Sequence, residues 1–221
     1  MNDLDLVRRV HQLGNALKRA AQWQGSSIEV DSAKDDFVYE LLCYVSAALA
    51  AAIHFKTELI LRPHPKSKKM VPLFPKKPGH KKNFSLLLLR RPDSKVEFEL
   101  CPGIVVEDRH GKRRAPDINL LCANAPADPK HIHLCAMWDA KYVRDDSQRV
   151  ADTAVSDFVV TFEELGGPTP PSNWSSVIGI QAFRASGIIT NGCESTERVG
   201  MLKQRKICET HGFPKKPTTR P

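Results

Sequence analysis

Residues 132–143 read IHLCAMWDAKYV, and this stretch decides the expected fold. Apolar side chains occupy both alternating sets of positions, which is typical of a strand at the centre of a sheet. Asp139 and Lys141 interrupt the apolar run. Side chains two positions apart on a strand point to the same side, so these two should project together. A charged pair is costly to bury on a central strand unless something compensates it, so the segment predicts a strand with a functional group of charges.

A second short pattern, APDI at residues 115–118, begins another predicted strand over 117–122. If this strand is the antiparallel neighbour of the first, Asp117 lies beside Asp139. Two carboxylates then converge next to the ammonium group of Lys141. The alternative is that Pro116-Asp117 only forms a turn and that Asp139 and Lys141 form a surface ion pair of little energetic value.

Converging carboxylates beside a lysine suit the hydrolysis of a phosphodiester. Magnesium prefers oxygen ligands and is usually held by one or two carboxylates together with water and phosphate. We therefore expect Asp117 and Asp139 to bind Mg²⁺ (or Mn²⁺), with the carbonyl of Ala140 as a third ligand. Lys141 would orient the attacking water or stabilise negative charge that develops on the phosphate.

Glu40 is the candidate for a further acidic group. It lies in the middle of a predicted helix over residues 33–55, within an otherwise apolar run. An acidic side chain at such a position has a cost that needs a reason. The alternative, a partly exposed glutamate with no role, stays open.

The other predicted elements complete an α/β (α+β) pattern with a mixed sheet flanked by helices. Predicted helices are 4–22, 33–55, one that opens at Asp145 or Asp146 and stops at Gly166, and 194–209. Predicted strands are 84–90, 95–100 with a continuation over 104–106, 117–122, 132–143 and 187–190. Residues 177–186 are ambiguous between helix and strand.

Pro116-Asp117, followed by 21 residues and then Asp139-Ala140-Lys141, resembles the motif of the PD-(D/E)XK nuclease superfamily. The segment SGIITNG at 186–192 is also similar to the late strand and helix of Mrr-type restriction endonucleases. The resemblance covers about residues 33–210. It implies a restriction-endonuclease-like core that runs helix, three meandering strands, helix, strand.

By this resemblance Asp117 and Asp139 would be metal ligands, Lys141 the catalytic lysine and Glu40 an auxiliary acid. The implied activity is that of a metal-dependent endonuclease acting on DNA, with RNA still open, in a setting of defence or restriction. Residues 1–32 would form a helical extension, 33–210 the nuclease-like domain with a basic insertion at 59–83, and 211–221 a basic tail. We expect a homodimer or a protein partner that supplies targeting or activation.

Charge along the chain points to a polyanionic partner. The chain has 221 residues and a formal net charge of +8, but ten basic residues and no acidic one fall within 59–92. The rest of the chain carries 23 basic and 25 acidic residues, so the excess is local. The candidates for phosphate contacts lie in the proline-rich loop 62–82 and in the turn that precedes Asp117; they are Lys66, Lys68, Lys69, Lys76, Lys77, Lys81, Lys82, Arg109, Lys112, Arg113 and Arg114. Lysines that only face solvent are the alternative.

The remaining signals concern compartment and competing functions. The sequence has no apolar run long enough to span a membrane and no secretory signal at its N-terminus. Its six cysteines form no CxxC pair, which favours free thiols in the cytoplasm over a zinc site. Two other functions stay open. One is a catalytically inactive nuclease-fold module that binds nucleic acid or a protein, and the other is a different hydrolase or structural protein.

Overall fold

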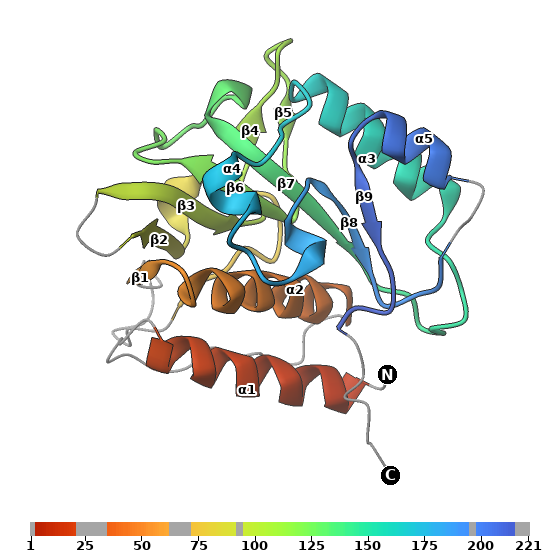
Figure 1. Ribbon diagram of the computed structural model, residues 1–221, viewed down its shortest axis with the longest axis horizontal. Coiled ribbons are helices and arrows are strands. Elements are labelled where there is room, and N and C mark those ends of the chain that lie inside the picture. The colour runs from red at the N-terminus through yellow and green to blue at the C-terminus, as the bar shows by residue number, and fades with distance from the viewer. Residues whose placement is uncertain (1–2, 21–34, 62–71, 92–94, 195–197, 215–221) are drawn as a thin grey trace.

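The computed structural model describes residues 3–20, 35–61, 72–91, 95–194 and 198–214. A mixed seven-stranded sheet has helix α2 on one face and helices α3 and α5 on the other, and α1 lies outside α2 (Figure 1). The helices are α1 Asp3–Ala20, α2 Asp35–Ala52, α3 Asp152–Glu164, the single turn α4 Ser172–Ser175 and α5 Val199–Gln204. Short 3₁₀ turns are Lys81–Asn83, His131–His133 and Gln181–Phe183.

The sheet has the strand order β1-β2-β3-β6-β7-β8-β9. Its strands are β1 Lys56–Ile60, β2 Leu86–Arg90, β3 Val96–Pro102, β6 Ile118–Cys122, β7 Leu134–Lys141, β8 Gly187–Thr190 and β9 Cys208–Thr210. From β1 to β7 every neighbouring pair is antiparallel, whereas β7, β8 and β9 are parallel. A parallel pair needs a crossover, and α3 lies within the crossover from β7 to β8. The expected mixed α/β class with flanking helices is confirmed.

Helix α2 is the centre of one core. Asp35 and Asp36 lie in its first turn, where negative charge favours the helix dipole, and the following alanines and leucines are strong helix formers. Most of the helix is buried, because α1 covers its outer side and the sheet covers its inner side. The hydroxyl of Tyr44 donates to the carbonyl of Leu100 on β3, which fixes the helix to the sheet. A second core lies under α3 and α5.

Two strand predictions differ from the structure. Residues 104–106 do not continue β3, because the chain turns away at Gly103, which has a φ of +46°. It forms instead a separate small hairpin of β4 Val106–Glu107 and β5 Arg113–Arg114. Strand β1 was not expected, because the predicted helix and loop left residues 56–61 unassigned.

The predicted helix over 194–209 is confirmed only for a short central part. Of the residues that the structure describes in this range, only α5 is helical, and Lys206, with a φ of +58°, follows its end. The chain then enters β9, which pairs with β8. Gly187 allows this close approach, because a Cβ at that position would lie 2.0 Å from the carbonyl oxygen of Cys208. An amphipathic pattern cannot reveal such a contact between distant residues.

Two boundaries also differ. The third helix begins at Asp152 and not at Asp145 or Asp146, because Asp145 caps a turn through a hydrogen bond to Ser147. Strand β7 begins at Leu134, after a 3₁₀ turn. No helix among the described residues combines the length and the apolar character needed to cross a bilayer. All six cysteines are free thiols, and Cys193 is exposed.

Candidate active site

The antiparallel pairing of β6 and β7 brings Asp117 and Asp139 together. Ile118 pairs with Trp138, so Asp117 and Asp139 occupy the next position along the two strands. The amide of Ala140 donates to Oδ2 of Asp117 at 2.8 Å, and the amide of Asp117 lies 3.4 Å from Oδ1 of Asp139. Each carboxylate thus faces the backbone of the other strand. The convergence of the two acids follows from this register.

Lys141 closes the cluster. Its Nζ lies 3.0 Å from Oδ2 of Asp139 and 3.8 Å from Oδ2 of Asp117. Lys141 is the last residue of β7 and pairs with Thr190, so its backbone is still part of the sheet. Its side chain is 31% exposed, and those of Asp117 and Asp139 are 18% and 19% exposed. The three groups therefore form a sheltered charge cluster that solvent still reaches.

The surroundings shift the proton affinities of this cluster. Burial and the charge of Asp139 raise the pKa of Asp117 well above its ordinary value, although Lys141 opposes the shift. Burial alone would lower the pKa of Lys141, but Asp139, Asp117 and Glu40 together raise it to about 12. Lys141 is therefore protonated at neutral pH.

Glu40 reaches the same place from helix α2. A small hollow holds both Glu40 and Asp117; it is lined by Phe37, Glu40, Leu41, Phe74, Pro75, Pro102, Gly103 and Asp117. Burial raises the pKa of Glu40 to about 7, with a lowering contribution from Lys141 and a raising one from Asp139. Glu40 thus interacts with the cluster through its charge and through the shared hollow. The structure brings together all four predicted catalytic residues.

The donor chemistry of the cluster fits a hydrated Mg²⁺, because two carboxylates converge and hard cations prefer oxygen. Asp117 and Asp139 would hold the ion. Within the described residues no group of three or more His, Cys, Asp or Glu side chains is arranged to hold a metal ion, so Glu40 does not complete a three-carboxylate site. Ala140 joins the cluster through its amide, and its carbonyl remains an expected ligand.

A basic segment runs past the hollow. We call residues 72–79 the strap. Phe74 and Pro75 line the hollow, and the next two residues, Lys76 and Lys77, are exposed. These two lysines are therefore the predicted phosphate contacts that lie closest along the chain to the hollow. Lys66, Lys68 and Lys69 lie outside the described residues.

Lys81 has a different place from the one expected. Its side chain is only 8% exposed, forms an ion pair with Glu99 of β3 and donates to the carbonyl of Ala125. These contacts attach the segment around Lys81 to the sheet, so Lys81 has a structural role and is not free to bind phosphate. Lys82, the next residue, is exposed.

The turn over residues 109–112 does not lie beside the site, although it is close to Asp117 in sequence. Arg109 donates to the carbonyl of Glu163, and Arg114 pairs with Asp108 and Glu164. Glu163 and Glu164 end α3, which runs from the end of β7 back toward the start of β8 (Figure 1). These contacts place Arg109 and Arg114 at the end of α3 that is farther from the end of β7, and a helix of 13 residues is about 20 Å long.

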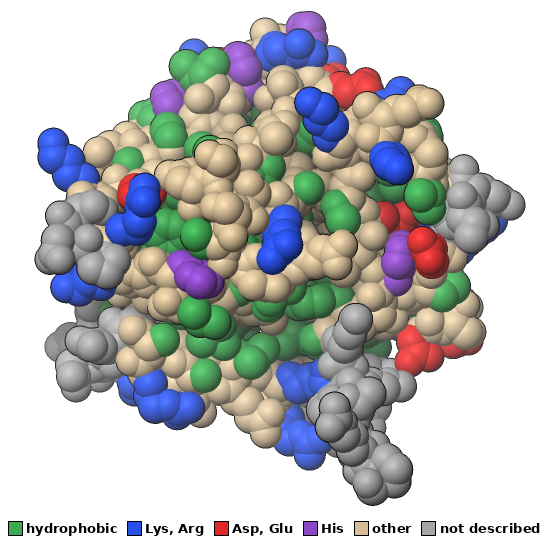
Figure 2. Space-filling view, in the orientation of Figure 1, with side chains coloured by type: hydrophobic (Ala, Val, Ile, Leu, Met, Phe, Trp, Pro, Cys, Tyr) green, Lys and Arg blue, Asp and Glu red, His purple; other side chains and the backbone are tan. Residues whose placement is uncertain are grey.

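Two cations, one in this turn and one just after it, already have partners, which weakens the turn as a phosphate-binding surface. Arg114 is held between two carboxylates, and Arg109 is fixed to α3. Lys112 and Arg113 are exposed and remain candidates. Figure 2 shows the basic side chains of this face dispersed over the surface rather than gathered in one dense patch.

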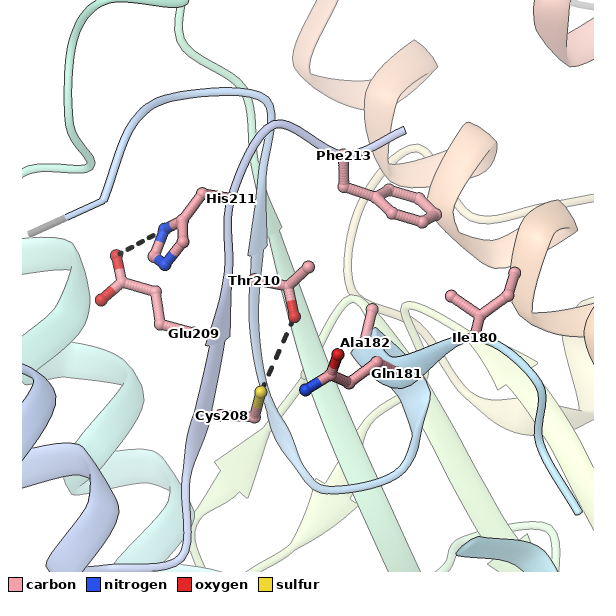
Figure 3. Close-up of a pocket in the computed structure, with 8 residues that line it drawn as sticks. All are labelled: Ile180, Gln181, Ala182, Cys208, Glu209, Thr210, His211 and Phe213. Atoms are coloured by element: carbon pink, nitrogen blue, oxygen red, sulfur yellow. Dashed lines mark hydrogen bonds and ion pairs between the residues drawn. The ribbon is translucent and has the colours of Figure 1, made fainter. Parts of the chain in front are cut away.

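A second hollow lies along the edge strand β9 (Figure 3). It is lined by Ile180, Gln181, Ala182, Cys208, Glu209, Thr210, His211 and Phe213. Nδ1 of His211 lies 4.0 Å from Oε1 of Glu209, and Sγ of Cys208 lies 3.7 Å from Oγ1 of Thr210. None of the predicted site residues lines this hollow, so the predicted chemistry belongs to the cluster on β6 and β7.

Sequence reasoning missed Phe74 and Pro75 as walls of the site. They belong to a loop whose approach to Asp117 depends on distant contacts, including the pairing of Gly79 with Ile104. No local sequence pattern predicts that this loop lies next to Asp117.

Comparison of the chain with protein-family models, with curated proteins and with solved structures gives no match. Function therefore has to be inferred from the residues of the cluster and from their geometry.

Proposed function

We propose that this protein is a metal-dependent endonuclease that hydrolyses phosphodiester bonds of DNA. The observation that carries the proposal is the convergence of Asp117, Asp139 and Lys141 at the adjoining ends of β6 and β7. Two carboxylates can hold a hard cation, and a lysine beside them can bind a phosphate oxygen. The proposal includes Mg²⁺ (or Mn²⁺) as the cofactor.

The order of the elements supports this proposal. Helix α2 is followed by the antiparallel run β3-β6-β7, then by α3 and by the parallel strand β8. This agrees with the order helix, three meandering strands, helix, strand that the PD-(D/E)XK resemblance implies. Within the proposal, these elements are a restriction-endonuclease-like core, and β1, β2, β9 and the β4–β5 hairpin are additions to it.

The chain's own residues divide the chemistry among them. A bound Mg²⁺ would polarise the scissile phosphate and acidify a water molecule. Lys141, whose pKa is about 12, keeps its proton and donates to the phosphate or to the attacking water. Glu40, whose pKa is about 7, exchanges its proton near neutral pH and can accept one from that water.

Substrate contacts in this proposal come first from the strap. Lys76 and Lys77 are exposed next to the residues that line the hollow, so they can reach the phosphates that flank the scissile bond. Lysine–phosphate contacts position a nucleic acid without reading its sequence. We therefore assign targeting to a second copy of the chain or to a protein partner, in a cytoplasmic defence or restriction setting.

One observation favours a second function, an inactive nuclease-fold module that binds nucleic acid or a protein. Asp117, Asp139 and Lys141 already satisfy one another through ion pairs and backbone hydrogen bonds. These contacts come from the protein's own groups and need no cation or substrate. The two functions differ in whether bound DNA is cleaved.

The test is a cleavage assay with plasmid, linear DNA and RNA in Mg²⁺, Mn²⁺ or EDTA. Asp139→Ala and Lys141→Ala remove members of the cluster, and Asp128→Ala is the matched control because Asp128 is exposed and pairs with His80. The proposal expects metal-dependent cleavage that only the first two substitutions abolish. Cleavage that survives EDTA or both substitutions overturns it, and binding without cleavage favours the inactive module.

A further inference from the structure

We propose that Asn191 is the positioning residue that holds Lys141 in the cluster. This inference rests on the proposed function, because it gives Asn191 a role in that chemistry. Asn191 is 6% exposed and directly follows β8. Its side-chain amide makes two hydrogen bonds to the backbone of Val143, which lies two residues after Lys141.

The two hydrogen bonds replace a missing part of the sheet. The ladder between β7 and β8 ends at the pair of Lys141 and Thr190. Beyond it the amide of Val143 donates to Oδ1 of Asn191 at 2.8 Å, and Nδ2 of Asn191 donates to the carbonyl of Val143 at 2.7 Å. A side chain thus supplies the donor and the acceptor that a continued strand would have supplied. The end of β7 is thereby fixed on both sides of its last residue.

The segment that carries Asn191 is itself held in place. The amide of Gly192 donates to Oγ1 of Thr190, and the amide of Cys193 donates to the carbonyl of Gln148. On its other side, the amide of Phe213 donates to the carbonyl of Thr190. Asn191 therefore projects from a rigid base.

Lys141 needs such support, because its long side chain must meet two acceptors at once. Its Nζ lies 3.0 Å from Asp139 and 3.8 Å from Asp117, and both partners are fixed by strand register. Strand ends fray where few contacts hold them. If β7 frays at its last residue, Lys141 moves away from the carboxylates while Asp117 and Asp139 stay paired. Asn191 prevents this through its hydrogen bonds to Val143, and it does not line the hollow.

The decisive measurement is the reactivity of Lys141, which does not require any catalytic activity. The side chain of Lys141 is only 31% exposed and is ion-paired with Asp139 and Asp117, so it should react slowly with an acylating reagent. Asn191→Ala should release the end of β7, expose the side chain of Lys141 and speed its acylation relative to the wild type. Peptide mass spectrometry follows Lys141 against the exposed Lys206 as an internal reference.

Two further variants complete the design. Asn191→Asp retains an acceptor for the Val143 amide but loses the donor to the Val143 carbonyl, so it should give an intermediate rate, and it serves if the alanine variant does not fold. Asn173→Ala is the matched control, because its amide donates to Glu97, far along the chain from the cluster. This control should leave the reactivity of Lys141 unchanged.

Cleavage assays supply the second readout. Loss of Asn191 should lower kcat with little change in KM, because the strap lysines that bind the substrate stay in place. An unchanged reactivity of Lys141 in a folded Asn191 variant overturns the inference. If the wild-type protein cleaves nothing, the proposed function fails, but the acylation rates still decide whether Asn191 positions Lys141.

Discussion

The backbone amide of Ala140 donates a 2.8 Å hydrogen bond to Oδ2 of Asp117. A side chain that directly precedes β6 is thereby fixed to β7 between two charged residues, Asp139 and Lys141. The arrangement of the three charged groups depends on this contact and on the strand register, so it should persist when a single charge is removed. Substitutions in the cluster should therefore change chemistry more than stability.

Asp117→Asn should lower cleavage by at least about 100-fold, a loss comparable to that of one preorganised electrostatic group. Its stability should respond to pH in the opposite way from a favourable salt bridge. The pKa of Asp117 is raised in the fold, so its contribution to stability is present at low pH and is lost as the pH rises through the raised value. The asparagine does not ionise and avoids this loss.

Thermal unfolding at pH 5 and pH 8 checks the stability part of this prediction. The melting temperature of Asp117→Asn minus that of the wild type should be larger at pH 8 than at pH 5. A difference in melting temperature between the variant and the wild type that stays constant or falls from pH 5 to pH 8 would contradict the raised pKa.

Glu40→Gln should remove one limb of the pH–rate profile. The pKa of Glu40 rises from 4.5 to about 7 because of burial, so the wild-type rate should increase as the pH passes through about 7 and Glu40 becomes a base. The glutamine variant should be slower and flat in this range. Initial cleavage rates from pH 5.5 to 8.5 provide the measurement, and a limb near pH 7 that persists in the variant would rule out Glu40 as its source.

Removing both strap lysines, Lys76 and Lys77, should weaken DNA binding without affecting stability. Each lost phosphate contact should reduce the slope of log affinity against log salt by about 0.9 for a duplex. The matched control removes Lys203 and Lys206, which are equally exposed but belong to the α5 region. Binding titrations at several salt concentrations measure both slopes, and equal slopes for the two double variants would remove the strap from the substrate surface.

Lys81 should matter for folding and not for binding. Lys81→Met leaves the buried Glu99 without its cation and should cost about 3–5 kcal/mol of unfolding free energy. The double variant Lys81→Met, Glu99→Leu should recover most of that loss, because both charges are gone. Urea denaturation measures the two free energies. If Lys81→Met is as stable as the wild type, the ion pair between Lys81 and Glu99 does not stabilise the fold.

Two glycines offer a contrast in the C-terminal part of the chain. A Cβ on Gly192 would lie 2.3 Å from the carbonyl oxygen of Gln148, whereas a Cβ on Gly200 meets nothing within 4 Å. Gly192→Ala should therefore destabilise the fold by about 1–3 kcal/mol. Gly200→Ala, within α5, should stabilise it by about 0.5–1 kcal/mol. Denaturant unfolding compares them, and similar values would contradict the close packing at Gly192.

The core of the site could be predicted from sequence because it depends on local rules. The two-residue period of a strand places Asp139 and Lys141 on one side, and antiparallel neighbours bring in Asp117. Glu40 was identified by the cost of its charge within an apolar helix, which is also a local signal. All four residues could therefore be identified from the sequence alone.

The rest depended on contacts between distant segments. The turn over residues 109–112 is near Asp117 in sequence, but Arg109 within it and Arg114 just after it bind the end of α3. Lys81 belongs to the same run of lysines as Lys76, Lys77 and Lys82, yet its ion pair with the buried Glu99, 18 positions away, gives it a structural role. Asn191 directly follows a strand, and its hydrogen-bond partner Val143 lies 48 positions away in the chain. The periodicity of the sequence contains no information about such contacts between distant residues.

The connection between β6 and β7 has an evolutionary consequence. Residues 123–133 join the far ends of these strands, away from the ends that carry Asp117 and Asp139. Insertions or deletions in this connection would leave the register of the two acids intact, whereas the loss of one residue within either strand would turn an acid to the opposite face. The 21-residue spacing between the acids is therefore free to vary among related proteins, but the distance from each acid to its strand is not. Homologues should be sought by the paired strand ends and not by a motif of fixed length.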